Sequence, residues 1–402
     1  MSQRPDFTLV EDQAEYQAML PVLEASDVIG YDTEFVAEDC YQPDLCLVQL
    51  STRDSIFVVD PKAVDMSAAW DLLVDGERLV IVHAGREETL FVQKATGKSM
   101  PRLFDVQVAL GLLGGEYPAS YGKLLLRILD INVAKGETRT DWRKRPLSQD
   151  QLNYAALDVL HLPELYDVLK SQLADQGRLA WLEDEIQARQ IALRHFTQQE
   201  SWVRISGIQS LRSKQLGVAR ELWSWREERA KSKNMPARRV LRDDLIVELA
   251  KRGLTDEKRI AQIRGMHHSG FQRFLPDIAR CVRNGLSAPV PEAPWAKRMR
   301  RTKPPALLQQ FLSAAMSYQC RSHSIASSIV GTTDDVGRLA GYWIDGKSLD
   351  EEHDDFPNLL RGWRREFVGD PLRDIFLGRR ALRVQDPHND MPLALCDIDA
   401  PE

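Results

Sequence analysis

The chain has 402 residues, 43% of them hydrophobic and 28% charged, and a formal net charge of −6 at pH 7. This length exceeds what one compact core usually supports, so we expect two or three domains. The composition is that of an ordinary soluble protein, and no apolar run is long enough to predict a membrane span. The five cysteines form no CxxC pair that would indicate a zinc site. The first residues lack a signal-peptide pattern, so we expect a cytoplasmic protein.

Residues 1–200 predict an α/β domain. Apolar, β-prone runs between polar turns predict strands, and they lie at 8–10, 28–35, 45–50, 56–59 and 78–83. Helical composition is found at 11–25 and 85–96, and over 147–173 apolar residues recur with a helical period. Strands first and helices afterwards predict a mixed sheet covered by helices.

The residues beyond 200 predict helices, which a Pro-rich stretch divides into two groups. We expect a first domain over 1–200, a helical domain over 208–286, a basic linker over 287–305, a second helical domain over 306–384 and a loose tail over 385–402.

The negative net charge does not exclude a nucleic-acid partner, because the basic residues are clustered. Residues 226–242 contain seven Lys or Arg against two Glu, and residues 297–303 contain five basic residues and no acid. Such patches can neutralise phosphates locally. A solvated helix face explains either patch alone equally well.

Two acids lie near the end of the strand expected at 28–35, in the order Asp32-Thr33-Glu34. Residues two apart on a strand point to one face, so the two carboxylates would lie side by side and repel each other. A cation between them relieves this repulsion, and Mg²⁺ or Mn²⁺ suits hard oxygen ligands. Taken alone, the pattern is more often an exposed strand edge.

Two further groups of side chains complete a candidate site. Glu87 and Glu88 follow Gly85 just past an expected strand, where they would begin a helix. Tyr154 and Asp158 are four residues apart on an expected helix and therefore share a face. Each pattern alone fits an ordinary helix. Combined with the strand acids, they can converge on two metal ions, one activating water and the other stabilising the leaving oxygen.

Three blocks of sequence resemble the exonuclease motifs of the ribonuclease D family. They are YDTEFV and LCLVQL at 31–36 and 45–50, HAGREE and LFDVQ at 83–88 and 103–107, and TDWRKRPL and YAALD at 140–147 and 154–158. In order and spacing they are similar to the tyrosine-containing branch of the DEDD 3′–5′ exonucleases. The resemblance implies an RNase H-like fold for the first domain.

The resemblance also implies four metal-binding acids, here Asp32, Glu34, Glu88 and Asp158, with Tyr154 orienting the catalytic water. It implies hydrolysis of the terminal phosphodiester with two divalent cations, Mg²⁺ or Mn²⁺, and release of nucleoside 5′-monophosphates. At position 88 the family has Asp, and Glu88 extends the carboxylate by one methylene. Catalytic constellations depend on close geometry, so we expect this ligand to weaken the site. An adapted site and a tolerated compromise both stay open.

The two helical segments carry the rest of the resemblance. Residues 208–286, with LWSWRE at 222–227, resemble an HRDC domain, and residues 306–384, with LRGWRRE at 360–366, are similar to the divergent second HRDC-like domain of ribonuclease D. We expect Trp225 and Trp363 to be core residues. The resemblance implies no protein partner.

RNA is the partner that the resemblance implies. Basic helical faces, including Arg238 and Arg239, would hold structured RNA while its single-stranded 3′ end enters the active site. Arg143 and Arg145 in the third block would meet phosphate, although a solvated surface explains them equally well. The favoured hypothesis is an exoribonuclease that trims RNA 3′ ends, with precursor transfer RNA as the substrate class. A DNA-directed exonuclease and a catalytically silent RNA-binding protein are the alternatives.

Overall fold

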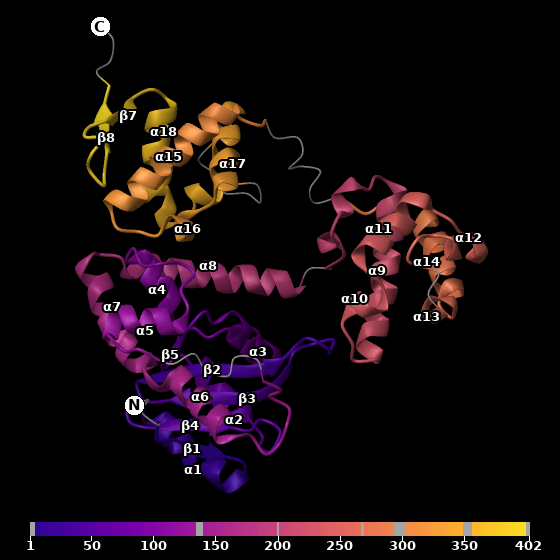
Figure 1. Cartoon of the computed structure of the whole chain (residues 1–402), viewed down its shortest axis with the longest axis horizontal. Coiled ribbons are helices and arrows are strands. Elements are labelled where there is room, and N and C mark those ends of the chain that lie inside the picture. Colours follow the sequence, from indigo (N-terminus) through magenta and orange to yellow (C-terminus); the bar gives the residue numbers. More distant parts are fainter. Residues whose placement is uncertain are drawn as a thin grey trace. The chain divides into compact units, whose positions relative to one another are not determined.

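The computed structural model describes residues 5–133, 140–198, 201–266, 269–292, 302–348 and 356–398. The chain divides into two compact units, which Figure 1 shows in colours that follow the sequence. Unit 1 consists of Met1–Glu34, Leu45–His195 and Arg301–Glu402, and unit 2 consists of Phe35–Asp44 and Phe196–Arg300. Most of the basic segment 297–303 and much of the expected linker 287–305 lie outside the described residues.

A six-stranded mixed sheet forms the centre of unit 1, as the sequence predicts. Its strands are β1 (Thr8–Val10), β2 (Val28–Val36), β3 (Asp44–Ser51), β4 (Ile56–Val59), β5 (Leu79–Val82) and β6 (Leu103–Asp105). The spatial order is β1-β4-β3-β2-β5-β6. β1 is parallel to β4, β2 to β5 and β5 to β6, whereas β3 is antiparallel to β4.

In the part of the chain that contains this sheet, the described residues form eight helices. They are α1 (Gln13–Glu24), α2 (Ser67–Val74), α3 (Arg86–Thr96), α4 (Val106–Leu112), α5 (Tyr121–Leu129), α6 (Gln149–Leu160), α7 (Leu162–Asp175) and α8 (Leu179–Gln198). The single helix expected over 147–173 is two helices, because Pro163 lacks the N–H that a continuous helix needs and instead lies in the first turn of α7.

The two faces of β2 have different neighbours. On one face, Tyr31 is fully buried and its ring meets Trp70 of α2 edge-on, with centroids 6.1 Å apart. On the other face, a Cβ on Gly30 would lie only 2.2 Å from Ser51 Oγ and 3.2 Å from Leu162 Cβ. Glycine is required there because α7 approaches the sheet closely. This close packing places the helices α6 and α7 over the face of β2 that Asp32 and Glu34 share.

The described residues of Phe196–Arg300, the larger part of unit 2, form helices. Its elements are η1 (Ser201–Arg204), η2 (Ile208–Ser210), α9 (Lys214–Ser232), α10 (Ala237–Val240), α11 (Asp243–Arg252), α12 (Glu257–Ala261), α13 (Ser269–Gln272) and α14 (Leu275–Ser287). α9 and α14 pack so closely that a Cβ on Gly217 would lie 2.5 Å from the carbonyl oxygen of Gly285. Trp225 is buried against Phe274, in agreement with its expected core role.

The C-terminal part of unit 1 is also mainly helical. Its elements are α15 (Ala306–Ser322), α16 (Ser327–Val330), α17 (Thr333–Ile344), η4 (Asn358–Leu360), η5 (Arg365–Gly369), α18 (Asp370–Phe376), β7 (Arg380–Val384) and β8 (Leu393–Asp397). The loose tail expected over 385–402 is wrong for 393–397, because these residues pair antiparallel with β7. Alternating residues of β8 can pack on one side of this hairpin. This strand was not predicted from the sequence because its alternation is short and acidic residues flank it.

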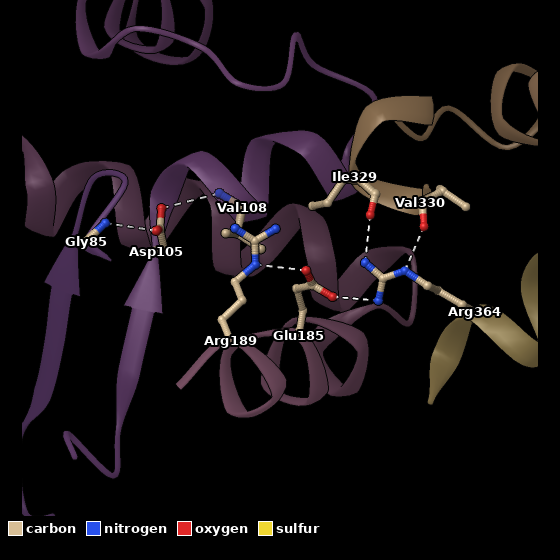
Figure 2. A network of polar contacts seen from close by, with 8 residues as sticks. All are labelled: Gly85, Asp105, Val108, Glu185, Arg189, Ile329, Val330 and Arg364. Atoms are coloured by element: carbon tan, nitrogen blue, oxygen red, sulfur yellow. Dashed lines mark hydrogen bonds and ion pairs between the residues drawn. The ribbon is translucent and has the colours of Figure 1, made fainter. Parts of the chain in front are cut away.

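A buried ion-pair network joins the C-terminal helices to α8. Arg364 Nη1 lies 2.7 Å from Glu185 Oε2, and the same guanidinium donates to the carbonyl oxygens of Ile329 and Val330 at 2.7 and 2.8 Å (Figure 2). The other oxygen of Glu185 accepts from Arg189 at 2.8 Å. Burial raises the pKa of Glu185, but Arg364 and Arg189 outweigh this effect and hold the pKa below its usual value.

Further contacts also connect the C-terminal helices to the rest of unit 1. The ring of Trp363, which is buried as expected, stacks on Trp181 of α8 with centroids 5.0 Å apart. Arg178 donates to the carbonyl oxygens of Leu112 at 2.7 Å and His323 at 2.5 Å, so it links the end of α4 to the end of α15. The helical segment after residue 301 is therefore an integral part of unit 1. No described helix is long and apolar enough to cross a membrane.

We predict that Arg364→Leu destabilises unit 1 by roughly 3 kcal/mol, because removal of one partner leaves a buried carboxylate with incomplete compensation. Urea unfolding followed by tryptophan fluorescence measures the change. Arg365→Leu is the matched control, since its side chain is 46% exposed and its guanidinium lies 4.0 Å from the half-exposed Asp370. Equal midpoints for the two variants would contradict the structural role of Arg364.

Candidate active site

β2 carries two of the expected site residues. Asp32 and Glu34 occupy alternate positions of the strand, so their side chains leave the same face, whereas Tyr31 and Thr33 leave the opposite face. Tyr31 and Thr33 are buried, and Asp32 and Glu34 are partly exposed. The strand therefore holds two carboxylates at a fixed spacing with an accessible side.

Glu88 lies in the first turn of α3, as the sequence predicts. It is 6% exposed, and its Oε1 accepts a hydrogen bond from Thr33 Oγ1 at 2.7 Å. The turn that precedes it is tight, since a Cβ on Gly85 would lie 2.3 Å from a methyl carbon of Val82. The third carboxylate thus enters the site from the helix that follows β5.

Asp105 fixes this turn. Its carboxylate accepts from the backbone N–H groups of Gly85 at 3.1 Å and of Val108 on α4 at 3.3 Å (Figure 2). It also accepts from the backbone N–H groups of Ala84 at 3.1 Å and Gln107 at 2.9 Å. One side chain therefore caps α4 and holds the chain that leads into α3. Asp105 is therefore the N-cap residue of α4.

α6 contributes the remaining two residues. The helix begins at a capping box in which Ser148 and Gln151 satisfy each other's backbone N–H groups. Tyr154 and Asp158 lie one turn apart and their side chains are hydrogen-bonded. Burial, followed by the charge of Asp158, raises the pKa of Tyr154, so its hydroxyl remains protonated at neutral pH.

The four carboxylates repel one another. Burial first, and then Glu88, Asp158 and Glu34, raise the pKa of Asp32 well above its usual value. Burial, then Asp158 and Glu88, raise the pKa of Glu34 to about 8. Burial also raises the pKa values of Glu88 and Asp158 to about 7 each. Acids from β2, α3 and α6 therefore share one electrostatic site.

This donor set suits a divalent cation. Carboxylate oxygens are the preferred ligands of Mg²⁺ and Mn²⁺, and positive charge would relieve the repulsion that contributes to the raised pKa values of Asp32 and Glu34. Among the described residues, no three Asp, Glu, His or Cys side chains stand in an arrangement ready to hold a metal ion. Coordination would require the carboxylates to turn towards a common point.

Arg143 and Arg145, the two arginines of the third motif that were expected to bind phosphate, have different surroundings. Arg145 contacts the protein itself, since its guanidinium donates to Asp60 at 2.5 Å and to the carbonyl oxygens of Trp142 and Cys46, each at 2.8 Å. These contacts occupy the groups expected to bind phosphate and give Arg145 a structural role. The side chain of Arg143 is 36% exposed, with its Nε 3.6 Å from Asp141 Oδ1.

Arg238 and Arg239 lie on α10, which belongs to unit 2, whereas the carboxylate site belongs to unit 1. Both residues are exposed. The side chain of Arg238 is 81% exposed, and its guanidinium lies 3.9 Å from Asp243 Oδ2. Their exposure leaves the two guanidinium groups accessible from solvent.

Gln49 is a polar residue of this region to which the sequence analysis gave no role. It is fully buried on β3, and neither its Nε2 nor its Oε1 has a hydrogen-bond partner. Its side chain leaves the strand on the same face as that of Ser51, which donates to the Val159 carbonyl of α6 at 2.8 Å. The signal in the sequence is a lone amide within the apolar run LCLVQL.

Comparisons with known proteins agree on one family. Residues 7–174 match the family model described as a 3′–5′ exonuclease, and residues 215–282 match the model of the HRDC domain. Ribonuclease D of Nitrobacter hamburgensis is 31% identical over 382 residues, which cover 94% of this chain and 97% of that protein. Ribonuclease D of Zymomonas mobilis is 31% identical over 385 residues, with coverage of 94% and 96%.

Solved structures show the same fold. The crystal structure of Escherichia coli RNase D, titled an exoribonuclease involved in structured RNA processing, matches with a TM-score of 0.78 and 21% identity over 93% of this chain and 99% of that chain. The catalytic core of RRP6 from Trypanosoma brucei matches with a TM-score of 0.54 and 23% identity, over 70% and 80% of the two chains.

We predict that the metal-free protein loses stability as the pH rises from about 5 to 8. Acids whose folded-state pKa values are raised keep their protons while the unfolded chain releases them, so unfolding becomes more favourable over this range. Divalent cations should therefore raise the melting temperature more at pH 8 than at pH 5.5. Thermal unfolding in EDTA measures the loss of stability with pH, and thermal unfolding in Mn²⁺ measures the gain from the cation. The substitution Asp32→Asn should reduce both effects. An identical Mn²⁺ effect at the two pH values would contradict the electrostatic account.

Proposed function

Because the chain belongs to the ribonuclease D family and is a hydrolase of the 3′–5′ exoribonuclease type, we propose that it trims RNA 3′ ends at the four-carboxylate site of unit 1. The observation that supports this site most directly is that, besides burial, the charges of Glu88 on α3 and Asp158 on α6 raise the pKa values of Asp32 and Glu34 on β2. Each cleavage would release a nucleoside 5′-monophosphate. Precursor transfer RNA is the substrate class that we propose.

Asp32, Glu34, Glu88 and Asp158 are the proposed ligands of two divalent cations, Mg²⁺ or Mn²⁺. When bound, such cations activate water for attack on the phosphodiester and stabilise the leaving oxygen. Asp32 interacts with all three other acids, since each of them contributes to its raised pKa. We therefore assign it to both cations, Glu34 and Asp158 to one of them and Glu88 to the other.

Tyr154 is the proposed water-orienting residue. Its hydroxyl is hydrogen-bonded to Asp158 and its pKa is raised by burial and by that acid, so the phenol is a neutral hydrogen-bonding group rather than a phenolate. The ring is held against Trp142, with centroids 6.1 Å apart. A ring fixed in this way can orient water and the scissile phosphate without carrying a charge that would repel them.

RNA is the proposed partner, in the form of a structured molecule with a single-stranded 3′ end. Arg143, beside the third motif, is the proposed phosphate contact of unit 1. Arg238 and Arg239 of unit 2 are the proposed contacts for the structured part, since their exposed guanidinium groups can pair with phosphates. A reduced, cytoplasmic setting fits the five cysteines, none of which forms a disulfide in the described part of the chain.

Glu88 stands where the family is expected to have Asp, and this difference supports one alternative function, a catalytically silent RNA-binding protein. A second alternative is a DNA-directed exonuclease, which would use the same acids. Parallel assays on RNA and DNA oligomers of matched sequence separate the nuclease functions. Calorimetric titration with Mn²⁺ separates both from a silent protein, because a site that binds no cation cannot support this chemistry.

We predict that Asp32→Asn lowers kcat by several orders of magnitude while RNA affinity is retained, because the charge shared by both cations is lost but the phosphate contacts remain. Release of nucleotides from a 3′-tailed RNA and fluorescence anisotropy measure the two quantities. Glu87→Gln is the matched control, as Glu87 pairs with Arg86 in the same turn that carries Glu88. Wild-type turnover by Asp32→Asn would reject the proposed site.

We also predict that neutralising Arg238 and Arg239 reduces the salt dependence of RNA binding. Each lost phosphate contact lowers the slope of log affinity against log salt by about 0.7–0.9. The control double variant, Lys258→Gln with Arg259→Gln, removes two exposed charges from α12 of the same unit. If the control and the test variant changed the slope equally, a specific role for α10 would be excluded.

A further inference from the structure

A hydrogen bond joins Thr33 of β2 to Glu88, the proposed metal ligand in the first turn of α3. Thr33 Oγ1 donates to Glu88 Oε1 at 2.7 Å. Both residues are buried, with 5% and 6% of their surfaces exposed. A short bond from a hydroxyl to a buried carboxylate is stronger than a bond between neutral groups.

The sheet leaves room for this contact. β2 pairs with β5 only as far as Gly30, which lies opposite Ile81. Beyond Gly30 the edge of β2 is no longer covered by β5, and the helix that follows β5 brings Glu88 to it. Thr33 leaves β2 on the face opposite to Asp32 and Glu34, so Glu88 reaches the strand from a different direction than Asp158 does.

The length of the Glu88 side chain makes the contact possible. An Asp at this position would be shorter by one carbon–carbon bond, about 1.5 Å, and its carboxylate would not reach Thr33 Oγ1 from the same backbone. The β-branched Thr33 has a restricted χ1 angle and is packed in the sheet, so its hydroxyl is a fixed point. It holds one oxygen of Glu88, and the carboxylate also accepts a hydrogen bond from the backbone N–H of Glu88 itself.

We propose that Thr33 is a positioning residue, which compensates for the longer side chain of Glu88 by holding its carboxylate in place beside Asp32. The proposal rests on the proposed function, because it assumes that Glu88 is a metal ligand. It implies that the site has adapted to glutamate, and that the threonine hydroxyl matters only while position 88 is Glu.

A double-mutant cycle tests this dependence. The four proteins are the wild type, Thr33→Val, Glu88→Asp and the double variant, and each is assayed for Mn²⁺ affinity by calorimetry and for kcat and KM on 3′-tailed RNA. Thr33→Val should weaken Mn²⁺ binding and lower kcat by about tenfold or more, with KM little changed. In the Glu88→Asp background the same substitution should have no effect on either quantity. Thr33→Ser, which keeps the hydroxyl, should restore most of the loss.

Three results would overturn the proposal. An equal loss from Thr33→Val in both backgrounds would show that Thr33 acts only through the fold, and unfolding curves of the metal-free proteins would show the same destabilisation. Tighter Mn²⁺ binding by Thr33→Val would show that the threonine holds Glu88 away from the cation. An unchanged affinity and kcat would show that it does not position Glu88. The proposed function fails independently of these results, only if Asp32→Asn remains active.

Discussion

Like charges that are held together away from water destabilise a fold. The exonuclease domain holds four such groups, the carboxylates of its candidate active site, close to one another. The acids come from β2, α3 and α6, and burial followed by the charges of Glu88, Asp158 and Glu34 raises the pKa of Asp32. Their spacing therefore depends on rigid supports rather than on attraction between them. The strand, the capping box at Ser148 and the capped turn at Gly85 provide this rigidity.

α4 connects one of these supports to the C-terminal helices. At its start, Asp105 holds the turn that leads to Glu88, and at its end the carbonyl of Leu112 accepts from Arg178. Arg178 also binds the carbonyl of His323 in the segment after residue 301. The C-terminal helices thus stabilise the same helix whose N-cap supports the active site, although they contribute none of the proposed catalytic residues.

Much of this architecture could be predicted from the sequence. The first five strands and the acids on β2, α3 and α6 follow from apolar runs, residue spacing and the family motifs. β6 was not predicted, because three residues give too short a pattern to separate from the helix that follows. The structural role of Arg145 was also missed, since its partners Asp60 and Cys46 are distant in sequence. The bond between Thr33 and Glu88 depends on where β5 ends, and no spacing in the sequence reveals this.

The Arg364–Glu185 pair also has a consequence for synthesis of the chain. Its two residues are 179 positions apart, and residues Phe196–Arg300 of unit 2 lie between them in the sequence. At roughly 5–20 residues per second, translation needs on the order of ten seconds to pass from one to the other. Throughout this interval the emerging first domain carries a glutamate, and Trp181 beside it, without their final partners. Ribosome-bound intermediates and prematurely terminated products therefore expose a surface that chaperones and proteases can recognise, whereas the finished chain conceals it.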